Sequence, residues 1–361
     1  KMRILNIIND LRIGGTEKSL INFCLNDKMN QNIVLSLAKT GANKELLINN
    51  NIQLYELDLK KNFFQSIKTI IKLLKNFKPN LIHSWMYHSH LVSFIISIFG
   101  FKVFWSIRNQ DISKKSVGLV TFVLIKFLGF LSNYKIKSII YNSYSAKLSH
   151  SVAGFSTRKS KIVYNGFDSN KSEININHQN SNIQNLIGCV GRYHPIKNHN
   201  LIFSALKIIV KNHKNIKICF VGKGFNNNNR RLVNILRNLK VYDNVILNDF
   251  VFDMNEQYQK FDFTILSSDY ESFPNVIAES MINGVPVIST DVGEARKIIS
   301  DYGILIKKNS VNELTNAINL FLKQIKKRDE WLSLKKKCNK HIQDNFSNKD
   351  MLNNFNKIFQ K

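Results

Sequence analysis

Short apolar, strand-like runs alternate with helix-length segments along most of this chain, and this alternation constrains its fold more than any other feature. In the first half, helical patterns at residues 63–77 and 87–99 lie between such runs. Two parallel strands need a long crossover connection, so regular alternation favours parallel βα units. The sequence therefore predicts the α/β class. The strand-like runs of the first half are residues 3–9, 32–37, 80–83, 102–106 and 138–142.

A polar, Asn-rich stretch at residues 169–185 divides the chain, and the alternation restarts after it. At 361 residues the chain is too long for one ordinary core, since a domain usually holds roughly 100–200 residues. We expect two Rossmann-like domains facing a cleft, at residues 1–168 and 186–344, with residues 169–185 as the linker. Residues 345–361 are expected to form a terminal helix that packs back on the first domain. The later strand-like runs are residues 186–190, 216–221, 244–247, 263–266 and 285–289, and the helical segments include 197–210 and 230–239.

The chain is strongly basic, with 52 Lys and Arg against 25 Asp and Glu and a formal net charge of +27. Such a charge favours an anionic partner, which can be nucleic acid, anionic lipid headgroups or a phosphorylated substrate. A solvated basic surface explains it equally well. The apolar segment 117–131 contains Lys126 and is shorter than the about 20 residues that a membrane span needs. We expect this segment to be a helix that is buried or lies at a membrane surface.

The four cysteines form no C-x-x-C pair, and Cys189 and Cys219 lie inside strand-like runs. They are typical of small core residues in a reducing compartment, not of a disulfide framework or a zinc site. Residues 1–9 are strand-like and too short for a signal peptide. These observations predict a cytoplasmic protein, with peripheral attachment at the inner face of the plasma membrane as an option.

Residues 262–291 contain the strongest functional signal. A strand is expected to end near Leu266, and after a polar loop a helix begins with Pro274 at its first position and stops at Gly284. The unpaired N–H groups and partial positive charge of such a helix start attract phosphate. Glu271 precedes the helix and Glu279 lies more than one turn into it, so the two carboxylates can hold different hydroxyl pairs. Alternatively, Asn275, Glu279 and Asn283 are spaced by four and can form an ordinary solvent-facing stripe.

The run E-S-F-P-N-V-I-A-E-S-M-I-N-G-V-P-V-I-S-T-D-V-G-E resembles the E-x7-E segment of the family-four retaining glycosyltransferases of the GT-B fold. The resemblance implies that Glu271 contacts the hydroxyls of the donor sugar and that Glu279 holds the nucleotide ribose. It also implies that the backbone of Phe273, Pro274, Asn275 and Val276 faces the sugar and phosphates of a UDP- or GDP-sugar. No cofactor is implied, and no metal is expected because a D-x-D sequence is missing.

Two further motifs agree with this resemblance. The run from Val190 to Lys197, V-G-R-Y-H-P-I-K, is similar to the family's G-R-x4-K phosphate clamp, in which Arg192 and Lys197 stabilise the charge that develops on the leaving diphosphate. Gly14 and Gly15 resemble the Gly-Gly-x-Glu loop, where glycines permit close approach of the backbone to the donor and acceptor.

Two other segments suggest contacts near the acceptor. The Trp-Met-Tyr-His run that ends at His88 resembles a segment of some capsule and O-antigen transferases, so His88 is predicted to contact acceptor or sugar. A satisfied core histidine is the alternative. Many family members carry a histidine where this chain has Arg108, which is therefore a second candidate for such a contact.

We therefore expect a retaining glycosyltransferase that moves a sugar from a nucleoside diphosphate sugar to an acceptor hydroxyl. The acceptor is expected to be a glycan or a lipid-linked intermediate of a surface polysaccharide such as capsule, O-antigen or lipopolysaccharide, at an anionic membrane surface. A nucleotide-sugar epimerase or hydrolase of the same fold is the alternative enzyme. A non-catalytic nucleic-acid-binding protein is disfavoured because no RNP-like motif, zinc finger or helix-turn-helix is evident.

Overall fold

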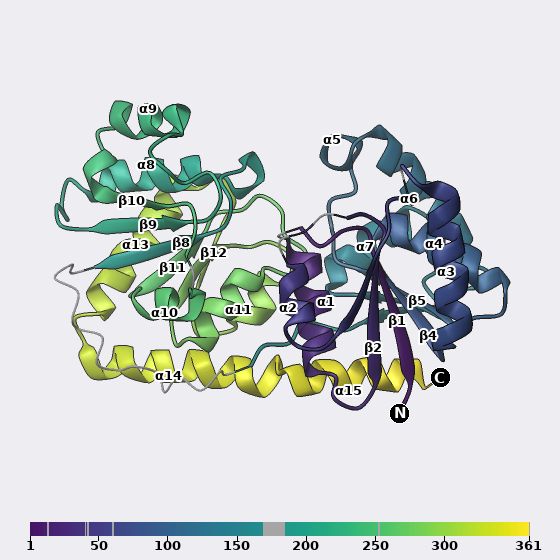
Figure 1. Ribbon diagram of the computed structural model, residues 1–361. Coiled ribbons are helices and arrows are strands. Elements are labelled where there is room, and N and C mark those ends of the chain that lie inside the picture. Colours follow the sequence, from purple (N-terminus) through teal and green to yellow (C-terminus); the bar gives the residue numbers. More distant parts are fainter. Residues whose placement is uncertain are drawn as a thin grey trace. The chain divides into compact units, whose positions relative to one another are not determined.

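The chain folds into two compact α/β units (Figure 1). The computed structural model describes residues 1–12, 14–39, 41, 43–59, 61–168, 185–251 and 253–360. Unit 1 comprises Lys1–Gly166 and Asn348–Lys361, and unit 2 comprises Phe167–Ser347. The prediction of two parallel α/β domains is confirmed. The predicted linker at residues 169–185 lies outside the described residues except for Asn185.

Unit 1 contains a seven-stranded parallel sheet in the order β3-β2-β1-β4-β5-β6-β7. The inner strands β4 and β5 are buried along their whole length, as expected for parallel strands covered on both faces. Strand order reverses between β1 and β4, and ligands of open α/β sheets bind at the carboxyl ends of strands at such a point. The strands are β1 (Arg3–Ile8), β2 (Gln31–Ser36), β3 (Gln53–Glu56), β4 (Leu81–Trp85), β5 (Val103–Ile107), β6 (Ser138–Tyr141) and β7 (Ser160–Ile162).

The helices of unit 1 include one from the C-terminal end of the chain. Helix α15 (Asn348–Phe359) buries Met351, Phe355 and Phe359 in the core that β1, β4 and α1 share. The phenyl ring of Phe355 lies 5.1 Å from that of Phe23 in α1. The other helices are α1 (Gly15–Asn26), α2 (Lys44–Ile48), α3 (Phe63–Phe77), α4 (Tyr87–Ile98), α5 (Lys114–Val117), α6 (Leu119–Leu131) and α7 (Tyr144–Val152).

Unit 2 contains a six-stranded parallel sheet in the order β10-β9-β8-β11-β12-β13, so its strand order reverses between β8 and β11. The strands are β8 (Leu186–Val190), β9 (Lys217–Val221), β10 (Val245–Asn248), β11 (Phe263–Leu266), β12 (Val287–Thr290) and β13 (Ile304–Ile306). Two short 3-10 helices, η1 (Pro195–Lys197) and η2 (Tyr242–Asn244), accompany the α-helices. These are α8 (His199–Ile209), α9 (Arg230–Asn238), α10 (Met254–Gln259), α11 (Asn275–Ile282), α12 (Ala295–Ile299), α13 (Val311–Gln324) and α14 (Arg328–Asn345).

The apolar segment predicted as a helix at residues 117–131 forms α6, after a break at Gly118, whose φ is +80°. Among the helices within the described residues, none combines the length and hydropathy needed to cross a bilayer. All four cysteines lie within the described residues, and each is buried and free.

Candidate functional site

The carboxyl ends of β8 and β11 lie side by side in the sheet of unit 2, at the point where its strand order reverses. A close backbone approach shapes this edge. A Cβ atom on Gly222, which follows β9, would lie 2.4 Å from the carbonyl oxygen of Gly191, which follows β8. Any side chain at Gly222, whose φ is +137°, would therefore collide with this backbone. This contact fixes the start of the loop from Gly191 to Lys197, which is the predicted phosphate clamp.

An ion pair joins this loop to the loop after β11. The Lys197 Nζ lies 2.6 Å from the Glu271 Oε1, and both side chains are less than a fifth exposed. The Ser268 hydroxyl donates a second hydrogen bond to the same carboxylate oxygen at 2.8 Å. The structure thus brings together two residues that the sequence predicts as catalytic, with a serine that the sequence analysis missed.

Several hydrogen bonds hold the loop after β8 against the loop after β11. The Asp269 N–H donates to the Ile196 carbonyl at 2.9 Å, and the Ser267 hydroxyl donates to the Lys197 carbonyl at 2.7 Å. Asn198 has φ +47°, which ends η1 and explains why the predicted helix at 197–210 starts only at His199. Its amide donates to the Asp269 carboxylate at 3.0 Å. These bonds fix the backbone beneath the Lys197–Glu271 pair.

Two further basic side chains lie in the clamp loop. Arg192 is exposed, as is His194. Burial and then the charges of Arg192 and Lys197 lower the pKa of His194. Arg192 and Lys197 thus lie close enough to His194 to disfavour its protonated form.

Helix α11 begins at Asn275, and Pro274 is its N-cap, not its first helical residue. The prediction for Pro274 is therefore wrong by one position, because its ψ of 86° is not helical. The helix ends at Ile282, and Gly284 follows with φ +71°, which confirms the predicted stop. Phe273 is buried, and its ring lies 5.9 Å from that of Phe346.

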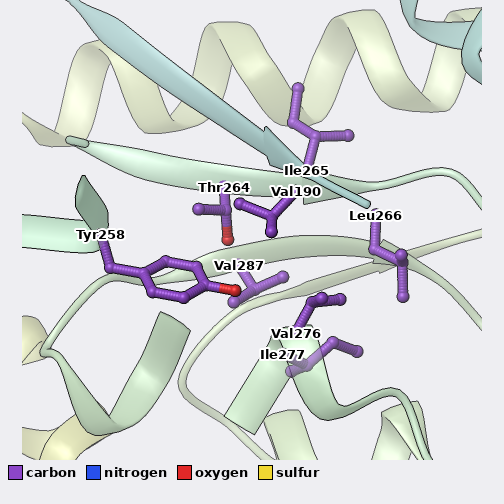
Figure 2. A pocket seen from close by; sticks show the side chains of 8 residues that line it. All are labelled: Val190, Tyr258, Thr264, Ile265, Leu266, Val276, Ile277 and Val287. Atoms are coloured by element: carbon purple, nitrogen blue, oxygen red, sulfur yellow. The ribbon is translucent and has the colours of Figure 1, made fainter. Parts of the chain in front are cut away.

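Glu279 is fixed by a tyrosine from the preceding helix. The buried Tyr258 of α10 donates its hydroxyl to the Glu279 Oε2 at 3.1 Å. A small, mainly apolar cavity lies beneath the first turn of α11, and Figure 2 shows the Tyr258 ring extending along it toward Val287. Asn275 and Glu279 are half-buried and Asn283 is buried, so these three positions do not form a fully solvent-facing stripe. The cavity is lined by Val190, Tyr258, Thr264, Ile265, Leu266, Val276, Ile277 and Val287.

The predicted glycine loop of unit 1 follows β1. Gly14 is the N-cap of α1 and Gly15 its first residue. A Cβ on Gly14 would lie 2.3 Å from a carboxylate oxygen of Glu17. Burial raises the pKa of Glu17. Gly14 thus leaves room for the Glu17 carboxylate at the start of α1, where a negative group stabilises the helix end.

Arg108 and His88 differ in their surroundings. His88 is exposed in the first turn of α4. Arg108 is only 8% exposed; it donates to the Asn165 side-chain oxygen at 2.6 Å, and its guanidinium lies 5.0 Å from the Trp85 ring centroid. Burial lowers the pKa of Arg108 to about 9. The structure gives Arg108 a packing role in unit 1, and contact of either side chain with an acceptor stays a prediction.

Within the described residues, no three His, Cys, Asp or Glu side chains gather as they would around a metal ion.

Comparison with solved structures identifies the architecture. The chain aligns over 99% of its length with the whole chain of Anabaena Alr3699/HepE in complex with UDP, with a TM-score of 0.86 and 20% sequence identity. It also aligns over its whole length with 99% of TarM, with a TM-score of 0.79 and 12% identity. The fold is GT-B. Within this GT-B chain, residues 170–337 match the family model described as Glycosyl transferases group 1.

Curated proteins also resemble this chain in sequence. An uncharacterized 41.2 kDa protein in the cps region of Klebsiella pneumoniae is 24% identical over 318 residues, which cover 81% of each chain. An N-acetylgalactosaminyltransferase of Campylobacter jejuni, named for a diphospho-undecaprenol acceptor, is 26% identical over 208 residues. That match covers 56% of this GT-B chain and 55% of the relative.

The sequence analysis also missed Gly293, which supports the Glu271 loop of this GT-B protein. Its φ is +52°, and a Cβ there would lie 2.2 Å from the Glu271 carbonyl oxygen and 2.3 Å from that of Ser272. We expect Gly293→Ala to lower the free energy of unfolding by about 2 kcal/mol or more, because both backbone strain and a clash follow. Chemical denaturation measures this.

Gly100→Ala is the matched control. Gly100 has φ +90° with no atom within 4 Å of its ideal Cβ. It shares the backbone strain, which costs about 1–2 kcal/mol, and lacks the clash. An equal loss in both variants would show that the clash adds nothing and that Gly293 does not support the Glu271 loop.

Proposed function

We propose that this chain transfers a sugar from a nucleoside diphosphate sugar to an acceptor hydroxyl, with retention of the anomeric configuration. The observation that carries the proposal is the Lys197–Glu271 ion pair, 2.6 Å long, at the strand-order reversal of unit 2. It places a cation for a diphosphate beside a carboxylate for sugar hydroxyls. The GT-B fold and the group 1 family match support this reading.

Each group has a defined task in this mechanism. The bond between the anomeric carbon and the diphosphate oxygen breaks while a bond to the acceptor oxygen forms on the same face. The acceptor proton passes to the departing phosphate, whose negative charge grows. Arg192 and Lys197 stabilise that charge more in the transition state than in the bound donor, so they raise the rate.

Glu271 is best suited to positioning the sugar. One of its oxygens already accepts bonds from Lys197 and Ser268, and a carboxylate bound in this way is a poor nucleophile. Its second oxygen can accept hydrogen bonds from sugar hydroxyls. Glu279 is proposed to hold the vicinal hydroxyls of the ribose. We propose no metal requirement, because Arg192, Lys197 and the start of α11 supply the positive charge that the diphosphate needs.

UDP- or GDP-sugars are the proposed donors, and a lipid-linked surface polysaccharide intermediate is the proposed acceptor. The Anabaena relative binds UDP and UDP-glucose in solved structures. The Campylobacter relative acts on a diphospho-undecaprenol acceptor by its name, and the Klebsiella relative is encoded in a cps region. These likenesses favour polysaccharide synthesis, which we propose takes place in the cytoplasm at the inner face of the membrane.

A donor screen tests the proposal. The full chain is incubated with each of several UDP- and GDP-sugars, with and without a polyprenyl-diphosphate-linked acceptor, in the presence of EDTA. We expect release of UDP or GDP that depends on the acceptor, and a product with the anomeric configuration of the donor by NMR. Equal release without acceptor would indicate a hydrolase, and no release with any donor would contradict the proposal.

The hydrogen bond from the Tyr258 hydroxyl to Glu279 leads to a prediction about binding of the ribose. Tyr258→Phe removes one hydrogen bond to Glu279 and little volume, so UDP should bind about three- to tenfold more weakly, which corresponds to a net hydrogen bond of about 0.7–1.4 kcal/mol. The preference for UDP over 2′-deoxy-UDP should fall as well. Isothermal titration with both nucleotides measures this.

Tyr242→Phe is the matched control, because the Tyr242 hydroxyl donates to Asn227 at 3.2 Å on an exposed surface. It should leave both affinities unchanged. If Tyr258→Phe binds both nucleotides as the unmodified chain does, Tyr258 has no role in holding Glu279 for the ribose.

A further inference from the structure

Helices α4 and α6 of unit 1 contact each other and both present apolar side chains to solvent. On α6 the exposed positions fall within one arc of about 100° of the helix, and their exposure runs from 51% at Phe127 to 79% at Val120. On α4, Phe99 at the C-terminal end is 76% exposed. We name this the α4–α6 face. It consists of Ile95, Ile98, Phe99, Leu119, Val120, Val123, Phe127 and Phe130.

Helix α3 repeats the pattern on the same flank of unit 1 (Figure 1). Its Phe63, Phe64, Ile67 and Ile71 are exposed within a similar arc. Lys68, Lys72 and Lys75 lie on the adjoining arc and are exposed as well. An apolar stripe bordered by lysines is typical of helices that lie in a membrane interface.

The stretch of chain that contains the α4–α6 face carries almost only positive charges. Residues 59–167 hold 17 Lys and Arg and a single acidic residue, Asp111. Lys114 and Lys115 are exposed on α5, which contacts α6, and Lys126 is exposed on α6 itself. The Lys126 Nζ lies 5.9 Å from the Phe122 ring centroid. Lys114, Lys115 and Lys126 therefore lie on α6 or on the helix that contacts it, and they can reach the same partner as the apolar stripe.

This combination selects one kind of partner. A second copy of the chain would bring two strongly positive faces together in a symmetric interface, which is repulsive. Nucleic acid would satisfy the lysines but offers no apolar layer for exposed aliphatic and phenyl side chains. An anionic bilayer offers both, since its phosphates attract lysines and its acyl boundary accepts apolar groups.

We infer that the α4–α6 face, extended by α3, docks on an anionic lipid bilayer. The apolar side chains enter the boundary between headgroups and acyl chains, and the lysines contact lipid phosphates. This inference rests on the proposed function for one point only. The proposed function supplies the reason for docking, which is access to a lipid-linked acceptor. The surface itself is defined by exposure and charge.

Vesicle co-sedimentation of the full chain tests the inference. The probes are phosphatidylcholine vesicles with and without 30% phosphatidylglycerol, at 0.1 M and 0.5 M NaCl. We expect binding only to the anionic vesicles, weakened by salt. Leu119→Ser with Phe127→Ser should weaken it at least tenfold at low salt. Lys114→Glu with Lys115→Glu and Lys126→Glu should abolish the salt-sensitive part.

The matched control is Ile208→Ser with Leu320→Ser, two exposed apolar residues of unit 2, which should bind vesicles normally. UDP titration of every variant separates the two proposals. Lost vesicle binding with normal UDP binding supports the α4–α6 face. No vesicle binding by the unmodified chain, or equal binding by the α6 variants, overturns it even where UDP binds. A dimer that the α6 variants disrupt, or tighter binding to an RNA oligonucleotide than to vesicles, overturns it as well.

Discussion

Lys197→Met is expected to lower the rate of sugar transfer by about 10²–10³-fold, the usual cost of removing one group that stabilises charge in a transition state. The Lys197 Nζ lies 2.6 Å from Glu271, and both side chains are largely shielded from water. The substitution removes the cation proposed to stabilise the leaving diphosphate. It also leaves Glu271 with one hydrogen-bond partner fewer, so sugar positioning should suffer too. Steady-state transfer assays with the preferred donor measure the effect.

Because the two side chains act together, their substitutions should not be additive. Lys197→Met with Glu271→Gln should be much less impaired than the product of the two single effects predicts. Lys197→Arg keeps the charge and should recover part of the rate. Lys207→Met, at an exposed lysine of α8, is the matched control and should transfer sugar normally. Transfer within threefold of the unmodified rate in Lys197→Met would remove Lys197 from the mechanism.

The sequence predicted the inner strands of both sheets because each is a nearly continuous apolar run. The three strands that the sequence analysis missed, β3, β7 and β13, each lie at the edge of a sheet. They are three or four residues long and only partly buried. Edge strands contact one neighbour and need fewer apolar residues, so their local pattern is weak.

The Lys197–Glu271 pair could not be predicted from spacing. The two residues are 74 positions apart, and each belongs to a motif whose local pattern implies only a loop before a helix. Their contact follows from the order of strands in the sheet, which places β11 beside β8. The sequence analysis therefore assigned Lys197 to the phosphate and Glu271 to the sugar. It did not predict that the two side chains form an ion pair.

Arg108 shows the same limit in unit 1. It follows β5, where a polar side chain at the end of a parallel strand usually suggests a ligand contact. Phe355 of α15 lies 5.7 Å from its guanidinium, and nothing near Arg108 in the sequence indicates this neighbour. A local sequence pattern does not reveal which distant segment of the chain buries a side chain.

Acid is expected to unfold unit 1 before unit 2. Burial lowers the pKa of His83 and His90 well below the ordinary value, and that of His150 to about 4, all in unit 1. In unit 2 burial lowers the pKa of His199 to about 3. Below about pH 6.5, and down to the lowered pKa of each histidine, the unfolded chain binds more protons than the folded chain. The free energy of unfolding therefore falls as the pH falls. Each group contributes about 1.4 kcal/mol per pH unit in that range.

Three such groups cost unit 1 about 4 kcal/mol per pH unit below pH 6, against a typical domain stability of about 5–15 kcal/mol. Burial raises the pKa of Glu17 in unit 1 and Asp262 in unit 2, so these carboxyls oppose the effect at lower pH. Unit 1 should therefore lose stability more steeply than unit 2 as the pH falls below about 6.5. Hydrogen exchange with mass spectrometry reads the two units separately. Tryptophan fluorescence reports mainly on unit 1, which holds Trp85 and Trp105 of the three tryptophans, and His90 stacks on Trp105 at 4.8 Å.

His150→Gln should reduce the pH dependence of unit 1 by about one proton, whatever it does to stability at pH 7.5, because the slope depends on the titrating group and not on the packing. His88→Gln is the control, since His88 is exposed on α4 only two residues before the buried His90. It should leave the slope unchanged. If unit 1 is equally stable at pH 7 and pH 5, the buried histidines do not set its acid limit, and repulsion among the chain's excess positive charges becomes the better explanation for any unfolding at still lower pH.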